Sequence, residues 1–174
     1  QINQYHIILA SGSPRRQHLL KEIGVQFDVM TPDVEEVWPE NLKREQIPLY
    51  LCELKAQSFS PDVLRADTLL ITADTIVLHN GDVVGKPAGR EDAIRILKKL
   101  SGSKHEVITG VCLRSSKEIH SFTVESEVWF RSFDEAEIAW YVDTYKPYDK
   151  AGAYGIQEWI GYVAIERIEG SWFN

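Results

Sequence analysis

The sequence is poor in cysteine and in long apolar runs, and both shortages narrow the class of protein. Two cysteines, Cys52 and Cys112, occur among 174 residues. They lie far apart and outside any metal-ligand spacing, so we expect free thiols in a reducing cytosol rather than a disulfide or a zinc site. The apolar runs are too short to cross a bilayer, and a basic region leading into an apolar core is missing. We therefore expect a cytoplasmic protein without a membrane partner.

Most familiar catalytic motifs are missing as well. The chain contains no P-loop, no G-x-G-x-x-G, no H-E-x-x-H and no G-x-S-x-G. Its five histidines lack ligand spacing, which argues against a metal hydrolase built on histidine. Positive charge is also scarce, since 19 Lys and Arg face 26 Asp and Glu for a formal net charge of −7. This balance disfavours nucleic acid as a partner, because nucleic-acid binders usually carry a basic face.

The chain does contain alternating helical and extended patterns. A hydrophobic content of 44% over 174 residues fits one domain, residues 1–174, that buries its own core. We expect an Asn80-Gly81 hairpin turn, and a capping box of Ser132 and Glu135 opening the helix 133–145. Further strands are expected at 7–10, 25–30, 68–78 and 160–168, and further helices at 48–59 and 90–100. Because hairpins interrupt the alternation, we predict a mixed α/β sheet.

The first expected strand ends in a candidate anion site. Ser11-Gly12-Ser13 forms a small-residue turn, Ser13 is placed to cap the next helix, and Pro14 suits its first turn. A helix N-terminus presents free N–H groups, and the addition of Ser11, Ser13, Arg15 and Arg16 makes an anion site that suits phosphate. The alternative is a capped helix with two solvated arginines.

Carboxylates and lysines are the remaining candidates for chemistry. Asp74 lies in an apolar strand, where a carboxylate must be paired, hydrogen-bonded or bound to metal. A structural ion pair and a catalytic or metal-binding role are both open for it. Glu35 and Glu36 share a loop that follows a strand, and solvation is their simplest explanation. Lys55 and Lys86 are ordinary surface candidates, although Gly85 and Pro87 restrict the backbone around Lys86.

Considered together, these residues fit a polyphosphate site. Hard oxygen ligands from Asp74 and from Glu35 or Glu36 suit Mg²⁺ or Mn²⁺, which also bind substrate phosphates. The basic residues that can neutralise a polyphosphate are Arg15, Arg16, Lys55 and Lys86. Such a site can direct water onto phosphorus by positioning and charge stabilisation.

Four motifs, in family order, resemble the Maf family of nucleoside triphosphate pyrophosphatases, first described as septum-formation inhibitors. They are Ala10-Ser11-Gly12-Ser13-Pro14-Arg15-Arg16, Ala73-Asp74-Thr75, Gly85-Lys86-Pro87 and Asp-Lys-Ala-Gly-Ala-Tyr-Gly-Ile-Gln at residues 149–157. Together they span nearly the whole chain, and the combination of all four, with the long one near the C-terminus, is highly specific. The resemblance implies an elongated mixed α/β sheet with two lobes around a central cleft, related to the inosine triphosphate pyrophosphatases.

The resemblance also implies a reaction and residue roles. The expected reaction is metal-dependent hydrolysis of the α–β phosphoanhydride, giving a nucleoside monophosphate and pyrophosphate. Asp74 corresponds to the proton acceptor. Thr75, Gln157 and either Arg15 or Arg16 correspond to selectivity positions, and Lys55, Lys86 and one of Glu35 and Glu36 to further polar residues of the cleft.

The motifs resemble most closely the branch that acts on dTTP and UTP. The Gln157 amide offers a donor and an acceptor that suit a pyrimidine edge. We expect a homodimer, and also a natural chain that continues past Asn174 with a Gly-Leu-Pro segment and a helix. The alternatives are a housecleaning enzyme for modified nucleotides and a cell-division regulator that acts through a protein partner. A DNA-binding regulator is disfavoured by the net charge.

Overall fold

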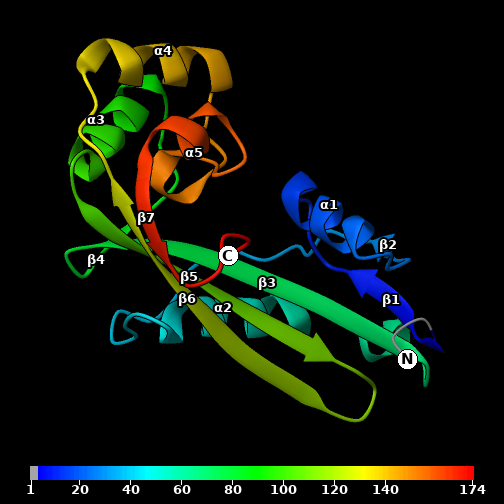
Figure 1. Cartoon of the computed structure of the whole chain (residues 1–174). Coiled ribbons are helices and arrows are strands. Elements are labelled where there is room, and N and C mark those ends of the chain that lie inside the picture. The colour runs from blue at the N-terminus through cyan, green and yellow to red at the C-terminus, as the bar shows by residue number, and fades with distance from the viewer. Residues whose placement is uncertain (1–3) are drawn as a thin grey trace. The chain divides into compact units, whose positions relative to one another are not determined.

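The computed structural model describes residues 4–174 and has a mixed α/β fold. Its described residues form a seven-stranded sheet in the order β2-β1-β3-β5-β6-β7, with β4 paired to β3 off this path (Figure 1). The strands are β1 His6–Leu9, β2 Asp28–Val29, β3 Thr68–His79, β4 Asp82–Val84, β5 Lys104–Arg114, β6 Ile119–Phe130 and β7 Ile165–Glu169. The α-helices are α1 Pro14–Glu22, α2 Gln46–Gln57, α3 Arg90–Leu100, α4 Glu135–Tyr145 and α5 Trp159–Val163, and the short 3₁₀ helices are Pro61–Val63 and Ala151–Ala153.

The sheet is mixed, as the sequence predicts. Strand β1 runs parallel to both β2 and β3, whereas β3 pairs antiparallel with β4 and β6 with β7. The β3–β4 hairpin turns at Asn80 and Gly81, whose φ angles of 54° and 85° confirm the expected turn. Among the described residues, no helix is both long enough and apolar enough to cross a membrane.

The chain divides into two compact units, and three long strands contribute residues to both. The first unit comprises residues 1–74 and 109–123, and the second comprises residues 75–108 and 124–174. The expectation of two lobes came from the family resemblance. Each unit has its own apolar core, and each is described by itself below.

In the first unit, α2 packs closely on β3 and β5. The buried cluster there is Ile8, Ala10, Cys52, Ala56, Phe59, Leu64, Leu70 and Cys112. A Cβ atom on Gly110 of β5 would lie 2.4 Å from the carbonyl oxygen of Pro48, so only glycine permits this approach. The Thr72 hydroxyl of β3 donates to the carbonyl oxygen of Cys52 at 2.6 Å. These contacts bring the side chains of α2 against β3. Cys52 and Cys112, which both lie in this cluster, are buried free thiols.

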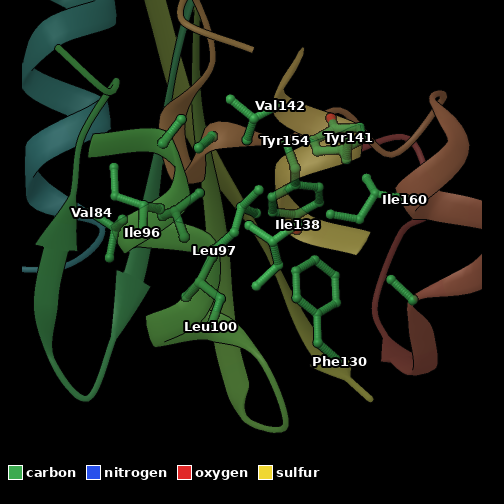
Figure 2. Close-up of a cluster of buried hydrophobic side chains, with 14 of the residues drawn as sticks. Val84, Ile96, Leu97, Leu100, Phe130, Ile138, Tyr141, Val142, Tyr154 and Ile160 are labelled. Atoms are coloured by element: carbon green, nitrogen blue, oxygen red, sulfur yellow. The ribbon is translucent and has the colours of Figure 1, made fainter. Parts of the chain in front are cut away.

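In the second unit, α3 and α4 pack beside β6 and the segment that follows α4. Figure 2 shows Leu97 of α3, Ile138 of α4 and Phe130 of β6 gathered around Tyr154. The Tyr154 hydroxyl and the Nε2 atom of buried His105 are 2.7 Å apart. Tyr154 thereby anchors the motif at residues 149–157 in this core.

Two local expectations were wrong. The capping box of α4 uses Asp134 and Glu137 rather than Ser132 and Glu135. The side chain of Ser132 lies next to Gly102, where an added Cβ would approach the Ser132 hydroxyl to 2.8 Å. The expected strand 160–168 is instead α5 followed by β7. Short apolar runs do not distinguish a strand from a buried helical turn.

The other expected elements need smaller changes. Helix α2 begins two residues before Pro48, and the expected strand 25–30 shortens to β2. Helix α3 occupies the predicted range, with Ala93, Ile96, Leu97 and Leu100 buried. Its apolar stripe recurs at helical spacing, which is the strongest local signal a sequence carries.

Candidate active site

The turn after β1 is placed beside the middle of β3 by the parallel pairing of the two strands. Leu9 lies opposite Ile71, and the N–H of Ala10 donates to the carbonyl oxygen of Ile71 at 2.8 Å. Strand β1 ends at this point, whereas β3 continues to His79. Residues 11–16 therefore begin next to the part of β3 that carries Asp74.

Arg16 is bonded directly to β3. Its Nη1 atom donates to the carbonyl oxygen of Ala73 at 2.8 Å and to the hydroxyl of Ser11 at 3.4 Å. Burial lowers the pKa of this guanidinium, and the negative charges of Asp74 and Glu36 oppose that shift. A partly buried guanidinium with carbonyl and hydroxyl partners is restrained in its orientation, which suits recognition of phosphate oxygens.

The two serines of the turn make different hydrogen bonds, and among the described residues the expected cap by Ser13 is not formed. Ser13 occupies the N-cap of α1, but in the described chain its hydroxyl makes no capping hydrogen bond. The buried hydroxyl of Ser11 instead accepts from the N–H of Ser13 at 3.2 Å while it also receives Arg16. Ser11 thus organises the turn, and Pro14 opens the helix as the sequence predicts. Arg15 lies near enough to Arg16 for its charge to help lower the pKa of Arg16.

Lys55 joins two carboxylates at one nitrogen atom. It projects from α2, and its Nζ atom contacts the Asp74 carboxylate of β3 and lies 2.7 Å from Oε1 of Glu36. Lys55 and Asp74 are both buried, whereas the side chain of Glu36 is 42% exposed. Of the two adjacent glutamates, Glu36 is therefore the one that the structure pairs with Lys55. Glu35 is an exposed residue of the same loop.

The pairing bears on both roles left open for Asp74. Burial raises the pKa of the Asp74 carboxyl, and the charge and hydrogen bond of Lys55 oppose this effect. Asp74 is thus an ion-pair member, as a structural role requires. A carboxylate with a raised pKa is also a better proton acceptor than a solvated one. The geometry is compatible with both the structural and the catalytic role. A substitution of Asp74 distinguishes them.

The carboxylates of Asp74 and Glu36 fit a divalent cation that is also bound by substrate phosphates. Asp74 and Glu36 direct carboxylate oxygens at the same ammonium group, so the two carboxylates lie close together. Within residues 4–174, no group of three or more His, Cys, Asp and Glu side chains gathers into a metal cage. Mg²⁺ usually takes one or two carboxylates and completes its shell with water and substrate phosphates. Asp74 and Glu36 meet that smaller requirement.

Thr75, Lys86 and Gln157 belong to the second unit. Lys86 is exposed and follows Gly85, whose carbonyl oxygen accepts from the N–H of Gly152 at 3.2 Å. Gly152 has a φ angle of 72° and packs on Val77 of β3, two residues beyond Thr75. Gln157 is exposed in the turn before α5. The motifs at residues 85–87 and 149–157 therefore meet through their backbones.

Three residues around the Gln157 turn, Tyr141, Lys150 and Glu158, were not among the predicted site residues. Tyr141 of α4 hydrogen-bonds to Glu158, and Nζ of Lys150 lies 3.1 Å from Oε1 of Glu158. Lys150 lies within the recognised motif and Glu158 directly follows it. A buried tyrosine on a helix carries no local signal of its partner, because that partner comes from a different part of the chain.

Comparisons with known proteins agree with these motifs. The family described as Maf-like protein matches residues 6–174. A dTTP/UTP pyrophosphatase of Bacteroides fragilis is 51% identical over 174 residues, which cover 99% of this chain and 90% of that protein. Enzymes of the same name from Porphyromonas gingivalis and Flavobacterium johnsoniae are 47% and 44% identical, covering 99% and 100% of this chain and 88% and 89% of theirs.

Among solved structures, the Ham1 protein of Staphylococcus aureus matches with a TM-score of 0.47 and 15% identity, covering 72% of this chain and 71% of that one. A likeness of this size carries no argument about the site.

Proposed function

The chain belongs to the Maf-like protein family, and from this premise we propose that it hydrolyses dTTP and UTP to the nucleoside monophosphate and pyrophosphate. The relatives that bear the name dTTP/UTP pyrophosphatase match it over nearly its whole length. The observation that carries the proposal is the cluster of Lys55, Asp74 and Glu36 in the same unit as the partly buried Arg16. This combination of fixed cations and carboxylates suits hydrolysis of a polyphosphate.

The cluster divides the reaction between binding and proton transfer. Arg16 and Arg15 hold phosphate oxygens, and Ser11 keeps the guanidinium of Arg16 in place. As water attacks phosphorus, its proton passes to the Asp74 carboxylate and the α–β phosphoanhydride bond breaks with pyrophosphate as leaving group. Lys55 holds the carboxylate in position and balances its charge. A positioned acid–base group of this kind contributes about 10²–10⁴-fold.

A divalent cation belongs to the proposal. Asp74 and Glu36 would hold Mg²⁺ or Mn²⁺, and Glu35 of the same exposed loop is the remaining carboxylate candidate. When bound, the cation supplies charge neutralisation for the phosphates. By the family resemblance, Lys86 supplies further positive charge for the phosphates. Gln157 and Thr75 are proposed to select the base, because an amide pairs with both a donor and an acceptor on a pyrimidine edge.

The setting of the enzyme is likewise inferred. We propose a homodimer that acts in the cytoplasm. The family resemblance supports the dimer, and the buried free thiols of Cys52 and Cys112 suit a reducing compartment. A regulator working only through a protein partner would have no need of a buried Lys55–Asp74 pair. The intact cluster therefore favours the enzyme over the cell-division regulator.

A panel of nucleoside triphosphates tests the proposal. Pyrophosphate release is measured with dTTP, UTP, dCTP, ATP and GTP, each with Mg²⁺, with Mn²⁺ and with chelator alone. We expect dTTP and UTP to give the largest kcat/KM and the chelator to abolish release. A preference for modified or purine nucleotides would instead indicate a housecleaning enzyme. Absence of hydrolysis on the whole panel would favour the regulator.

A further inference from the structure

One hydroxyl group connects the two ends of the turn that carries Gln157. The N–H of Gly155 donates to the Tyr141 hydroxyl at 3.2 Å, and the same hydroxyl donates to Oε2 of Glu158. The N–H of Glu158 donates to the carbonyl oxygen of Gly155 at 3.0 Å, which closes a four-residue turn. Ile156 and Gln157 are the central residues of this turn. Tyr141 therefore binds the residue before this pair and the residue after it.

The turn is restrained from its other side by α5. A Cβ atom on Gly161 would lie 1.7 Å from the carbonyl oxygen of Ile156, so the helix presses directly on the backbone next to Gln157. The N–H of Gly161 also donates to the carbonyl oxygen of Glu158 at 3.0 Å. Gln157 itself is exposed. A fixed backbone thus presents a solvent-facing amide side chain.

The tyrosine that holds the turn is itself rigid. Tyr141 is 0% exposed and stacks on Tyr145, with ring centroids 5.1 Å apart, and on Trp159 at 6.3 Å. Burial and the bond to Glu158 raise the pKa of the Tyr141 hydroxyl, so it stays protonated and able to donate. The second oxygen of Glu158, Oε1, lies 3.1 Å from Nζ of Lys150. Lys150 lies five residues before Gly155, at which the turn begins. Both oxygens of Glu158 are therefore engaged.

We propose that Tyr141 and Glu158 are positioning residues that set nucleotide selectivity by holding the Gln157 turn in one conformation. This inference rests on the proposed function, in which the Gln157 amide contacts the base. A polar group discriminates strongly between substrates only when its position is held, because a movable amide can pair with the wrong edge as well. In the proposed function, neither Tyr141 nor Glu158 takes part in proton transfer or in phosphate binding. Their loss should change which nucleotide is chosen more than how fast it is cleaved.

The variant Tyr141→Phe removes the hydroxyl and keeps the stacked ring. The matched control is Tyr145→Phe, which removes a hydroxyl from the neighbouring ring of the same helix. We expect Tyr141→Phe to lower the ratio of kcat/KM for dTTP to that for ATP about tenfold, while kcat for dTTP stays within about threefold. Most of the change should appear as a higher KM for dTTP. Tyr145→Phe should retain the wild-type ratio.

Two substitutions of Glu158 separate the hydrogen bond from general stability. Glu158→Gln keeps a carbonyl oxygen that accepts from Tyr141, so it should largely preserve the selectivity ratio. Glu158→Ala removes the acceptor and should reproduce the effect of Tyr141→Phe. The combination of Tyr141→Phe with Glu158→Ala should add little to either single change, because both break the same connection.

Hydrogen–deuterium exchange provides a readout that is independent of activity. The amides of residues 155–158 should exchange faster in Tyr141→Phe than in Tyr145→Phe. Unchanged exchange, an equal loss of kcat/KM on every nucleotide, or a lower melting temperature with the wild-type ratio would each overturn the inference. If the wild-type protein fails to hydrolyse dTTP and UTP, the proposed function fails, and the selectivity role of Tyr141 and Glu158 falls with it. The exchange result then reports on the turn alone.

Discussion

Arg16 donates a hydrogen bond from Nη1 to the main-chain carbonyl oxygen of Ala73, at 2.8 Å, one residue before Asp74 on the same strand. The proposed phosphate-binding group is thereby attached to the backbone that carries the proposed proton acceptor. Because a main-chain carbonyl in a sheet is held by the neighbouring strands, this bond restrains the guanidinium next to the strand that carries Asp74. This arrangement suits the proposed function, in which a phosphate is held near an attacking water.

Removing Arg16 should cost transition-state stabilisation. Arg16→Ala is expected to lose roughly 2–4 kcal/mol, the scale for one preorganised donor, which is about 30- to 1000-fold in kcat/KM. Arg16→Lys keeps the charge but not the planar fork, so it should restore activity only in part. The measurement is steady-state hydrolysis of dTTP, with the exposed Arg95→Ala of α3 as the control. If neither Arg15→Ala nor Arg16→Ala lowers kcat/KM tenfold, the phosphates bind elsewhere.

Asp74→Asn distinguishes catalysis from a structural ion pair. The substitution keeps the shape of the side chain and removes its charge, so we expect single-turnover hydrolysis to fall about 10²–10⁴-fold. Binding of dTTP, followed by calorimetry, should persist or tighten because repulsion from phosphate is lost. Asp143→Asn, an exposed pair with Arg90, is the matched control. Turnover close to wild type would remove Asp74 from the mechanism, and an unfolded variant would identify a structural ion pair.

Gln157→Glu should narrow the preference for pyrimidine nucleotides. The change replaces the amide donor with a charged acceptor on an exposed side chain, so folding should be unaffected. We expect the gap in kcat/KM between dTTP or UTP and the purine triphosphates to shrink. The measurement is the ratio of kcat/KM for dTTP or UTP to that for the purine triphosphates. It is compared among the wild-type protein, Gln157→Glu and Thr75→Ala. An activity loss that is equal for every nucleotide would exclude a role in base selection.

Gly110→Ala should destabilise the first unit. The added methyl group would lie 2.4 Å from the carbonyl oxygen of Pro48, so α2 must move away from β5. Overpacking of this kind costs about 1–3 kcal/mol. Because Lys55 projects from α2, activity should decline as well. Chemical denaturation compares this variant with Gly89→Ala, where an added Cβ meets open space. Equal stability of the two variants would contradict the close packing of α2.

Protein stability should fall as the pH drops below the ordinary histidine pKa. Burial lowers the pKa of His105 from 6.5 to about 3, so the folded state prefers the neutral ring. In the unfolded chain, His105 takes up a proton near pH 6.5. The stability that is present above pH 6.5 is therefore lost as the pH falls towards the pKa of His105 in the folded state. His105 alone should contribute a loss of about 1 kcal/mol between pH 7.5 and pH 5.5.

Denaturant midpoints at the two pH values test this expectation. His105→Gln should show a flatter dependence of stability on pH than the wild-type protein, even if it is less stable at pH 7.5. Burial also lowers the pKa of His79, and that shift acts in the same direction. A wild-type protein equally stable at both pH values would contradict a neutral, buried His105.

The elements that could be predicted from sequence are those decided by neighbours along the chain. The strand-turn-helix of residues 7–16, the Asn80-Gly81 hairpin and α3 follow from turn chemistry and from apolar residues at helical spacing. The four motifs that identify the Maf-like family are also short runs of adjacent residues. The α4 capping box was misplaced because Ser132 and Asp134 both have a glutamate three residues later. The structure selects Asp134, whose carboxylate accepts from the N–H of Glu137.

Contacts between distant segments decided the rest. Sequence could not choose between Glu35 and Glu36 because the choice depends on where α2 places Lys55, and that depends on how α2 packs on β3 and β5. The same holds for Tyr141, which lies 14 residues before Gly155 in sequence yet holds its turn by a hydrogen bond. Local propensity is set by adjacent residues, whereas these pairings exist only once helices and strands have packed. The tertiary structure therefore determines which member of each candidate pair faces the site.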